Sequence, residues 1–406
     1  EMSFAIRDLG CKGGVILTAS HNPKEYNGYK AYWDDGSQLV PPHDKNVIDE
    51  VKKVQVSDIK FEGVPEMITI LGKDFDKKSL DKVKTLSLSP EAIQKEHDLK
   101  IVFTPLHGTT YELVPASLHN WGFTNIHTVP EQSIPDGDFP TVASANPEEP
   151  AAFKMALDLA RKIDADLAMA CDPDGDRIGI AVKNDAGEWT LLNGNQTNII
   201  FTEYIIRRKK ELNQLKGGEY TVKTIVTTEL IKDIAEKNHI ICYDVYTGFK
   251  WIADVIRKEG GEKFIGGGEE SFGYMPGAFT RDKDGVSATS LMAEIAAWVK
   301  MQNKTLYSFL KEIYAKYGFS QERMIYIVRK GLSGAQEIKA MMEEFRHSSP
   351  KEINHSPVVL KKDYLSLEAT NLQTGEKTHL NFETKSDVLQ FFLADGSKIS
   401  VRPSGT

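Results

Sequence analysis

The chain has 406 residues, 40% hydrophobic and 27% charged, so it can form ordinary folded cores and is not disordered as a whole. Its net charge of −8 argues against the binding of nucleic-acid backbones as its main function. Cys11, Cys171 and Cys242 are too widely spaced for a disulfide framework or a zinc knuckle, which favours a reducing compartment such as the cytoplasm. We expect neither a signal peptide nor a membrane helix, because no apolar run approaches about 20 residues.

Short buried strands are predicted to alternate with amphipathic helices. The expected strands are 15–18, 100–103, 167–170 and 224–227, and the expected helices are 111–120, 151–162, 195–208 and 249–258. This alternation is typical of α/β layers, in which ligand-binding loops follow the carboxyl ends of the strands.

Changes in pattern divide the chain into four predicted domains. A charged helix and connector end the first, and a hairpin-type turn ends the second. From residue 319 an apolar run at 324–328, a helix over 335–345 and several short strands predict a separate α+β domain. The predicted domains are 1–97, 98–187, 188–318 and 319–406.

The first loop of chemical interest, 18–23, follows the first strand. It places the Ser20 hydroxyl on a tight turn, beside His21 and ten residues before Lys30. A serine nucleophile needs a proton acceptor and a group that holds the electrophile, and these neighbours offer both. The alternative is a turn that satisfies its own backbone, and a Ser-His turn taken alone is more often structural.

The second loop, 171–177, holds Asp172, Asp174 and Asp176 directly after a buried strand. Carboxylates this close repel each other, and a divalent cation relieves the repulsion. Oxygen ligands favour Mg²⁺ over zinc. An EF-hand is excluded because its positions six and twelve hold Arg177 and Lys183 instead of Gly and Glu. The alternative is a solvated acidic turn.

The third loop, 266–274, carries Glu269 and Ser271 beside three glycines and suits the recognition of sugar hydroxyls. It is not a dinucleotide fingerprint, because position 271 is not glycine. A plain glycine-rich turn is an equal alternative. Nearby, Arg281 and Lys283 could face a phosphate, although a charged run of this kind is more often a solvated turn.

Two further segments suit anions. The turn at 247–250 opens a helix whose N-terminus could hold one. The segment 402–406 offers an arginine, two hydroxyl groups and glycine-exposed amides, which together suit a phosphate group. Its alternative is an exposed tail.

Together these loops fit phosphoryl transfer to and from a sugar phosphate. The motifs TASHNP at 18–23, DPDGDR at 172–177, GEES at 268–271 and RPSGT at 402–406 resemble, in this order, the phosphoserine, metal, sugar and phosphate loops of the α-D-phosphohexomutase superfamily, the phosphoglucomutase/phosphomannomutase enzymes. Lesser matches are TPLHG at 104–108 and NPE at 146–148.

The resemblance implies a heart-shaped enzyme of four domains. Three similar α/β domains with mixed sheets would carry the phosphoserine, metal and sugar loops, and a smaller C-terminal α+β domain would carry the phosphate loop and close over the substrate. The family has further sequence before Glu1 and after Thr406, so we expect the N-terminal part of domain 1 to be missing and domain 4 to be truncated.

The implied activity is an isomerase that interconverts hexose 1-phosphate and hexose 6-phosphate, for glucose and also for mannose, through phosphoserine and a hexose 1,6-bisphosphate. The expected cofactors are Mg²⁺ and glucose 1,6-bisphosphate. The expected partners are sugar phosphates, without nucleic acid or membrane, for a cytoplasmic monomer or homodimer.

The resemblance also implies a role for each matching residue. Ser20 would carry the phosphoryl group and bind the metal together with Asp172, Asp174 and Asp176. His21 and Arg177 would lie near the transferring group, and Lys30 could serve as general acid/base. The residues expected to bind substrate are Thr247, Gly248, Lys250, Glu269, Ser271, Lys283, Arg402, Ser404, Gly405 and Thr406.

Several alternatives stay open. The segments at 32–33, 42–45 and 281–285 look most like the branch that also contains phosphopentomutases and a glucose-1,6-bisphosphate synthase. A phosphatase with Asp172 as nucleophile is a rival from another class, although it predicts Thr or Val at position 176, where this chain has Asp. A non-catalytic sugar-phosphate sensor is the third alternative, but Ser20 and all three aspartates are intact.

Overall fold

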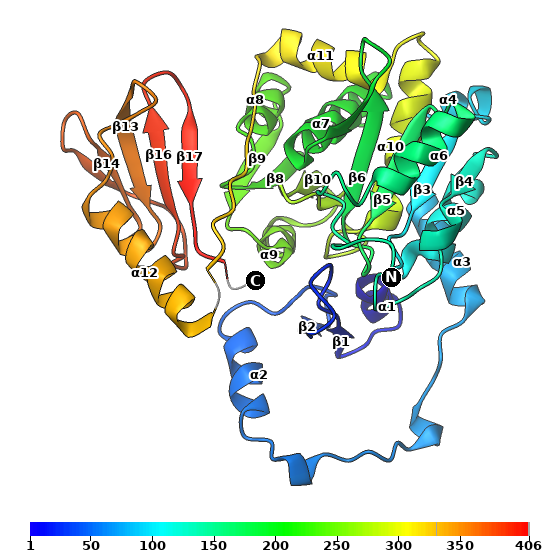
Figure 1. Ribbon diagram of the computed structural model, residues 1–406, viewed down its shortest axis with the longest axis horizontal. Helices are drawn as coiled ribbons and strands as arrows, with labels where there is room; N and C mark the ends of the chain where they lie inside the picture. The colour runs from blue at the N-terminus through cyan, green and yellow to red at the C-terminus, as the bar shows by residue number, and fades with distance from the viewer. Residues whose placement is uncertain (330, 405–406) are drawn as a thin grey trace. The chain divides into compact units, whose positions relative to one another are not determined.

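The computed structural model describes residues 1–329 and 331–404, which form two compact units, 1–321 and a second that begins at Glu322 (Figure 1). The fully described first unit contains three sheets, and the described part of the second contains one. The fold class of α/β domains with mixed sheets followed by a C-terminal α+β domain is confirmed. The division of the first unit into three domains stays a prediction.

The first sheet is an antiparallel pair, β1 (Gly13–Leu17) and β2 (Tyr29–Trp33), with Leu17 opposite Tyr29. Helix α1 (Met2–Asp8) packs against β1. The connection between the strands is the predicted serine loop. It folds back so closely that a Cβ at Gly28 would lie 2.0 Å from the carbonyl oxygen of Thr18, which only glycine permits.

The second sheet has the order β4-β3-β5-β6-β7. Its strands are β4 (Ile126–Thr128), β3 (Ile101–Thr104), β5 (Leu167–Cys171), β6 (Ile178–Lys183) and β7 (Trp189–Leu192). The pairs β4/β3 and β3/β5 are parallel, whereas β5/β6 and β6/β7 are antiparallel. Strands β3 and β5 are buried along their whole length, as expected of sheets covered on both faces. The metal loop is the β5–β6 turn.

The third sheet has the order β11-β10-β8-β9. Its strands are β11 (Tyr274–Met275), β10 (Phe264–Gly268), β8 (Tyr220–Thr224) and β9 (Ile241–Val245). The prediction of a strand over 224–227 is wrong, because β8 ends at Thr224 and the next residues turn. The hydroxyls of Thr224 and Thr227 both donate to the Glu270 carboxylate at 3.0 Å, and this tertiary bonding outweighs the strand preference of the intervening Ile-Val.

Helix α10 (Gly285–Lys300) lies at the centre of the first unit and is buried along nearly its whole length. It packs against α5 (Thr110–Trp121), α4 (Pro90–Lys95) and α11 (Leu306–Tyr317). A helix that is apolar on all sides is stable only in such a core. Its one buried acid, Glu294, accepts hydrogen bonds from the Tyr204 hydroxyl and the Leu88 amide, both at 2.8 Å.

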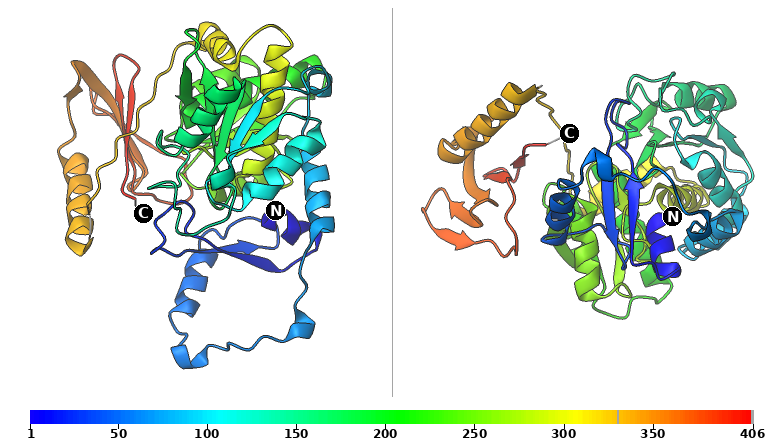
Figure 2. Two further views of the ribbon diagram at one scale, coloured as in Figure 1. Left: turned by 45° about the vertical axis from the view of Figure 1, so that its right-hand side comes forward. Right: turned by 90° about the horizontal axis from the view of Figure 1, so that it is seen from below.

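Most of the remaining helices lie beside the sheets. The remaining helices are α2 (His43–Val51), η1 (Val56–Asp58), η2 (Pro65–Met67), α3 (Lys73–Lys84), η3 (Pro130–Gln132), α6 (Lys154–Ile163), α7 (Gly194–Glu211), α8 (Leu230–Lys237) and α9 (Phe249–Glu259). The predicted helices match α5, α6, α7 and α9 within three residues. Figure 2 shows the segment 43–72, to which α2, η1 and η2 belong, extending away from the sheets. Within the described residues no helix has the length and apolar character of a membrane span.

The second unit places one helix, α12 (Gly331–His347), beside an antiparallel sheet. Its strands are β12 (Glu352–Ile353), β13 (Ser356–Asp363), β14 (Glu368–Asn371), β15 (Lys377–His379), β16 (Leu389–Leu393) and β17 (Lys398–Val401). Met342 of the helix packs on Val358, Leu389 and Phe391 of the sheet. The apolar run at 324–328 forms neither helix nor strand, and its side chains are exposed.

Candidate active site

The serine loop is held in a strained conformation. Ser20 has a φ of 55°, in the left-handed region that costs a non-glycine residue about 1–2 kcal/mol. The Thr18 hydroxyl compensates by accepting the Ser20 amide at 2.8 Å. This conformation directs Ser20 Oγ to the metal loop, where it donates to Asp172 Oδ2 at 2.8 Å. Strain of this kind is typical of functional sites.

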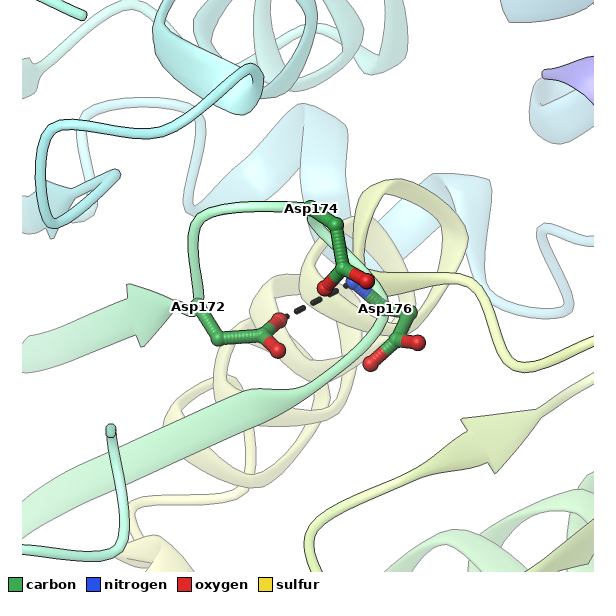
Figure 3. Close-up of side chains that lie close together, drawn as sticks. All are labelled: Asp172, Asp174 and Asp176. Atoms are coloured by element: carbon green, nitrogen blue, oxygen red, sulfur yellow. Dashed lines mark hydrogen bonds between the residues drawn. The ribbon is translucent and has the colours of Figure 1, made fainter. Parts of the chain in front are cut away.

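The metal loop gathers its three carboxylates at one point. Asp172, Asp174 and Asp176 each offer an oxygen within 4.8 Å of the others (Figure 3). Asp172, fully buried at the end of β5, shapes the turn by accepting the amides of Asp176 and Arg177 on Oδ1 at 3.0 and 2.9 Å. The three aspartates that the sequence analysis placed on one loop therefore form a single cluster in the structure.

The cluster fits a hard divalent cation. Asp174 Oδ1 and Asp176 Oδ1 are buried, and no group of the described residues donates to either. A buried carboxylate oxygen without a donor is costly unless a ligand completes it. Burial, with Asp176 and Asp174 adding to it, raises the pKa of Asp172 well above its ordinary value, which a bound cation would reverse. All donors are oxygens, as Mg²⁺ prefers.

Two lysines neutralise the outer side of this cluster. Lys30, on β2, places Nζ 3.1 Å from Asp174 and 3.3 Å from Asp176, and Lys283 places Nζ 2.9 Å from Asp176. Burial alone would raise the pKa of Asp176, but Lys283, Lys30 and Arg177 together hold it below its ordinary value. The same site thus supplies cations beside a serine hydroxyl.

Arg177 and His21 complete the surroundings of Ser20. Arg177 Nη1 donates to Glu148 at 2.6 Å, and its Nε lies 3.9 Å from Asp172. His21 Nδ1 is 3.2 Å from Ser20 Oγ. Burial, reinforced by the Arg177 cation, lowers the pKa of His21 to about 4. His21 is therefore a neutral hydrogen-bonding group at pH 7.

The predicted sugar loop is joined directly to the metal loop. The Ile178 amide donates to the Phe272 carbonyl at 3.0 Å, and Arg177 pairs with Gly273. Glu269 is buried and accepts the Gly248 amide, at the start of α9, at 2.5 Å. Burial foremost, with a smaller effect of Glu270, raises the pKa of Glu269 to about 7 although Lys283 opposes the shift.

The other predicted substrate residues divide into two groups. In the first unit Thr247 and Ser271 are half-buried beside this loop, whereas Lys250 forms an ion pair with Asp44 at 3.1 Å. In the second unit Arg402 and Ser404 are exposed after β17. Gly405 and Thr406 lie outside the described residues. Participation of these residues in binding stays a prediction.

Sequence reasoning missed two supports of the site. Glu148 anchors Arg177, and the only signal for it was the NPE match. The end of the TPLHG segment and the residue after it brace the metal loop, because Thr109 donates its amide to the Pro173 carbonyl at 2.8 Å. A Cβ at Gly108 would lie 2.3 Å from Pro173 Cα, so glycine is required for this close approach.

We expect Gly108→Ala to displace the metal loop, because the new methyl group meets backbone atoms that cannot rotate away. The expected destabilisation is about 1–3 kcal/mol, with a smaller rise of melting temperature on addition of Mg²⁺. Thermal unfolding with and without Mg²⁺ measures both effects. Gly137→Ala is the control, since its Cβ meets no atom within 4 Å. Equal behaviour of the two variants would contradict the bracing role.

Comparisons with known proteins agree with this geometry. The chain matches the phosphoglucomutase/phosphomannomutase α/β/α domains I, II and III over residues 1–57, 77–187 and 193–317. It is 36% identical over 410 residues to a phosphoglucomutase of Staphylococcus aureus strain N315, covering all of this chain and 73% of the relative.

Two solved structures share the fold. The open form of the Paramecium phosphoglucomutase parafusin has a TM-score of 0.64 at 20% identity, with 100% of this chain and 73% of that chain covered. The Aspergillus fumigatus N-acetylphosphoglucosamine mutase, in complex with GlcNAc-6P and magnesium, has a TM-score of 0.53 at 14% identity, with 88% and 84% covered.

Proposed function

Because the chain belongs to the phosphoglucomutase/phosphomannomutase family, a family of intramolecular phosphotransferases, we propose that it interconverts hexose 1-phosphate and hexose 6-phosphate. The observation that carries the proposal is the 2.8 Å contact of Ser20 Oγ with Asp172 inside the carboxylate cluster. Glucose is the proposed main substrate and mannose a second one. The two sugars differ only at C2, and a loop that contacts O3 and O4 separates them weakly.

Ser20 enters the proposed reaction as phosphoserine. Its P–O bond breaks as the phosphoryl group passes to the free hydroxyl of hexose 1-phosphate, whose proton is taken up by a base in the site, while the leaving Ser20 oxygen gains a proton and becomes a hydroxyl. The resulting hexose 1,6-bisphosphate turns over in the site. Its O1–P bond then breaks as the 1-phosphoryl group returns to the Ser20 hydroxyl, which loses its proton, and the sugar O1 gains a proton, so that hexose 6-phosphate leaves. Glucose 1,6-bisphosphate would serve as activator by rephosphorylating Ser20. Among the cations we assign Lys30 as general acid/base, since it borders both the serine loop and the cluster.

Asp172, Asp174 and Asp176 would hold Mg²⁺ together with Ser20 Oγ, and the ion would supply positive charge to the transferring phosphoryl group. Lys30 and Lys283 form ion pairs with two of these carboxylates, Asp174 and Asp176. When those carboxylates hold Mg²⁺, the two ammonium groups can form ion pairs with phosphate oxygens instead. Arg177, fixed by Glu148, faces the same charge. The chain thus provides an electrostatic site of the kind phosphoryl transfer requires.

The sugar would be held by the other loop. Glu269 and Ser271 would accept and donate hydrogen bonds at the 3- and 4-hydroxyls, with Thr247, Gly248 and Lys250 beside them. Lys283 would contact phosphate or substrate. Arg402, Ser404, Gly405 and Thr406 would bind the phosphate that is not transferred. We further propose a cytoplasmic monomer or homodimer.

The phosphatase alternative is disfavoured by the bonding of Asp172. Its Oδ1 accepts two backbone amides, its Oδ2 accepts Ser20 Oγ, and the residue is fully buried. If either Asp172 oxygen attacked a substrate phosphate, it would have to give up these hydrogen bonds. Ser20 is partly exposed, and within the described part of the chain its Oγ forms hydrogen bonds with only two side chains, Asp172 and His21, and with no backbone amide.

The test is a coupled assay of the purified protein for glucose 6-phosphate formed from glucose 1-phosphate, with Mg²⁺ and glucose 1,6-bisphosphate supplied. Mannose and ribose 1-phosphates measure substrate preference, and mass spectrometry locates phosphate on the peptide that holds Ser20. Turnover with phosphorylated Ser20 supports the proposal. Preferred turnover of ribose 1-phosphate would indicate a phosphopentomutase, and net synthesis of glucose 1,6-bisphosphate would indicate a glucose-1,6-bisphosphate synthase. An aspartyl phosphate with unmodified Ser20 would indicate a phosphatase, and no turnover at all a sensor.

A further inference from the structure

A second place on the first unit has the character of an anion site. An open groove with a volume of about 560 Å³ lies between α1, α3, the loop after α9 and the segment 277–281. None of its lining residues belongs to the phosphoserine, metal or sugar loops. Its basic residues are Arg7, Lys82 and Arg281. A volume of this size accommodates a phosphate with a small organic group attached.

Two guanidinium groups converge in this groove. Arg7 Nη1 donates to the carbonyls of Ala278 and Phe279 at 2.8 and 2.7 Å, and Arg281 Nη1 donates to the same Ala278 carbonyl at 2.5 Å. Because they share an acceptor, the two cations are immediate neighbours. Burial, with the repulsion of Arg7 added, lowers the pKa of Arg281 to about 10.

Nothing in the described part of the chain neutralises this pair at short range. Neither arginine forms a salt bridge with a described carboxylate. Asp8, which also lines the groove, is paired with Lys78 at 2.6 Å, and Glu262 lies exposed at the groove. Asp35 acts on Arg281 only through longer-range attraction. Two like charges held together are costly unless an anion occupies the space between them.

One donor atom in the pair is also unused. Arg281 Nε is buried, and the described residues offer it no hydrogen-bond acceptor. Lys283, two residues further along, carries its ammonium to Asp176, so the two side chains belong to different sites. A guanidinium with a free Nε–H can bind an oxyanion through two parallel hydrogen bonds.

From the cavity, the unneutralised pair and the free donor together, we propose that this groove binds the phosphate group of a small molecule, apart from the phosphoserine site. Arg281 and Arg7 provide two neighbouring positive charges for a dianion. The ligand is either a phosphate monoester or free inorganic phosphate. The proposal does not depend on the proposed mutase function.

The test follows the Nε–Hε resonance of Arg281 by NMR, assigned by its loss in Arg281→Gln. Titration of the protein with inorganic phosphate is expected to shift this resonance, and Arg7→Gln is expected to weaken the affinity at least about tenfold. Arg7→Lys, which keeps the charge but loses the fork, should weaken it less. Arg161→Gln is the control, because Arg161 lies on α6 in a separate ion pair with Asp158 at 3.1 Å.

Glucose 6-phosphate in place of inorganic phosphate identifies the source. Tighter binding of glucose 6-phosphate supports a monoester ligand, and equal or weaker binding supports free phosphate. If the Arg281 resonance stays fixed while phosphate binding elsewhere saturates, the groove is not an anion site. An affinity that Arg7→Gln leaves unchanged would also overturn the proposal. Mutase activity measured without added phosphate is expected to be unaffected by Arg7→Gln, which separates this test from that of the proposed function.

Discussion

Replacing Ser20 by Ala is expected to reduce the turnover of glucose 1-phosphate by at least about 10⁴-fold, because the variant has no oxygen to carry the phosphoryl group. Folding should be little affected. The variant loses two side-chain contacts, to Asp172 and to His21, while the loop keeps the Thr18 bond to the backbone amide. The coupled assay and thermal unfolding measure the two effects.

Ser57→Ala is the matched control, since Ser57 is exposed in the segment 43–72. Its activity should equal that of the unmodified protein. Turnover of Ser20→Ala within about tenfold of the unmodified protein would show that another residue carries the phosphoryl group. Phosphate recovered on the peptide of residues 171–177 would then identify it.

Removal of Mg²⁺ by a chelator, or weakening of its site by Asp174→Asn, is the second change with a large expected effect. Asp174 is chosen because its Oδ1 is buried without a donor in the described residues, whereas Asp172 shapes the loop. Loss of one of three carboxylates should raise the Mg²⁺ concentration needed for half-maximal activity by at least about 100-fold. Chelation should abolish turnover, and added Mg²⁺ should restore it.

Asp185→Asn is the control for this change, because Asp185 is exposed and forms an ion pair with Lys311 at 2.5 Å. Its Mg²⁺ dependence should match that of the unmodified protein. Activity that survives chelation, or an unchanged Mg²⁺ requirement in Asp174→Asn, would contradict the assignment of the cluster as the metal site. Melting temperatures with and without Mg²⁺ provide a readout that does not depend on turnover.

The local parts of this site were predictable because their geometry follows from short spacings. Aspartates at i, i+2 and i+4 after a buried strand necessarily share one turn, and the structure brings them within 4.8 Å. Strands β3 and β5 were predicted within one residue, since continuous apolar runs bounded by turns leave few alternatives. The same reasoning failed at 224–227, where Glu270, distant in sequence, captures two threonine hydroxyls and ends the strand.

The sequence by itself determined which chemistry is present: a serine on a tight turn, a three-carboxylate loop and a buried-strand framework that presents them. Tertiary structure alone decided which charged side chains lie against them. Lys30, Lys283 and Glu148 lie 144, 107 and 29 positions from the partners they hold, and no spacing rule connects such distances. Tertiary structure also places Lys283 and Arg281 in different surroundings, although they are two residues apart. Lys283 forms an ion pair with Asp176, whereas Arg281 shares the Ala278 carbonyl with Arg7. Local order follows from backbone periodicity, whereas electrostatic partners are selected when remote loops pack together at the edges of the sheets.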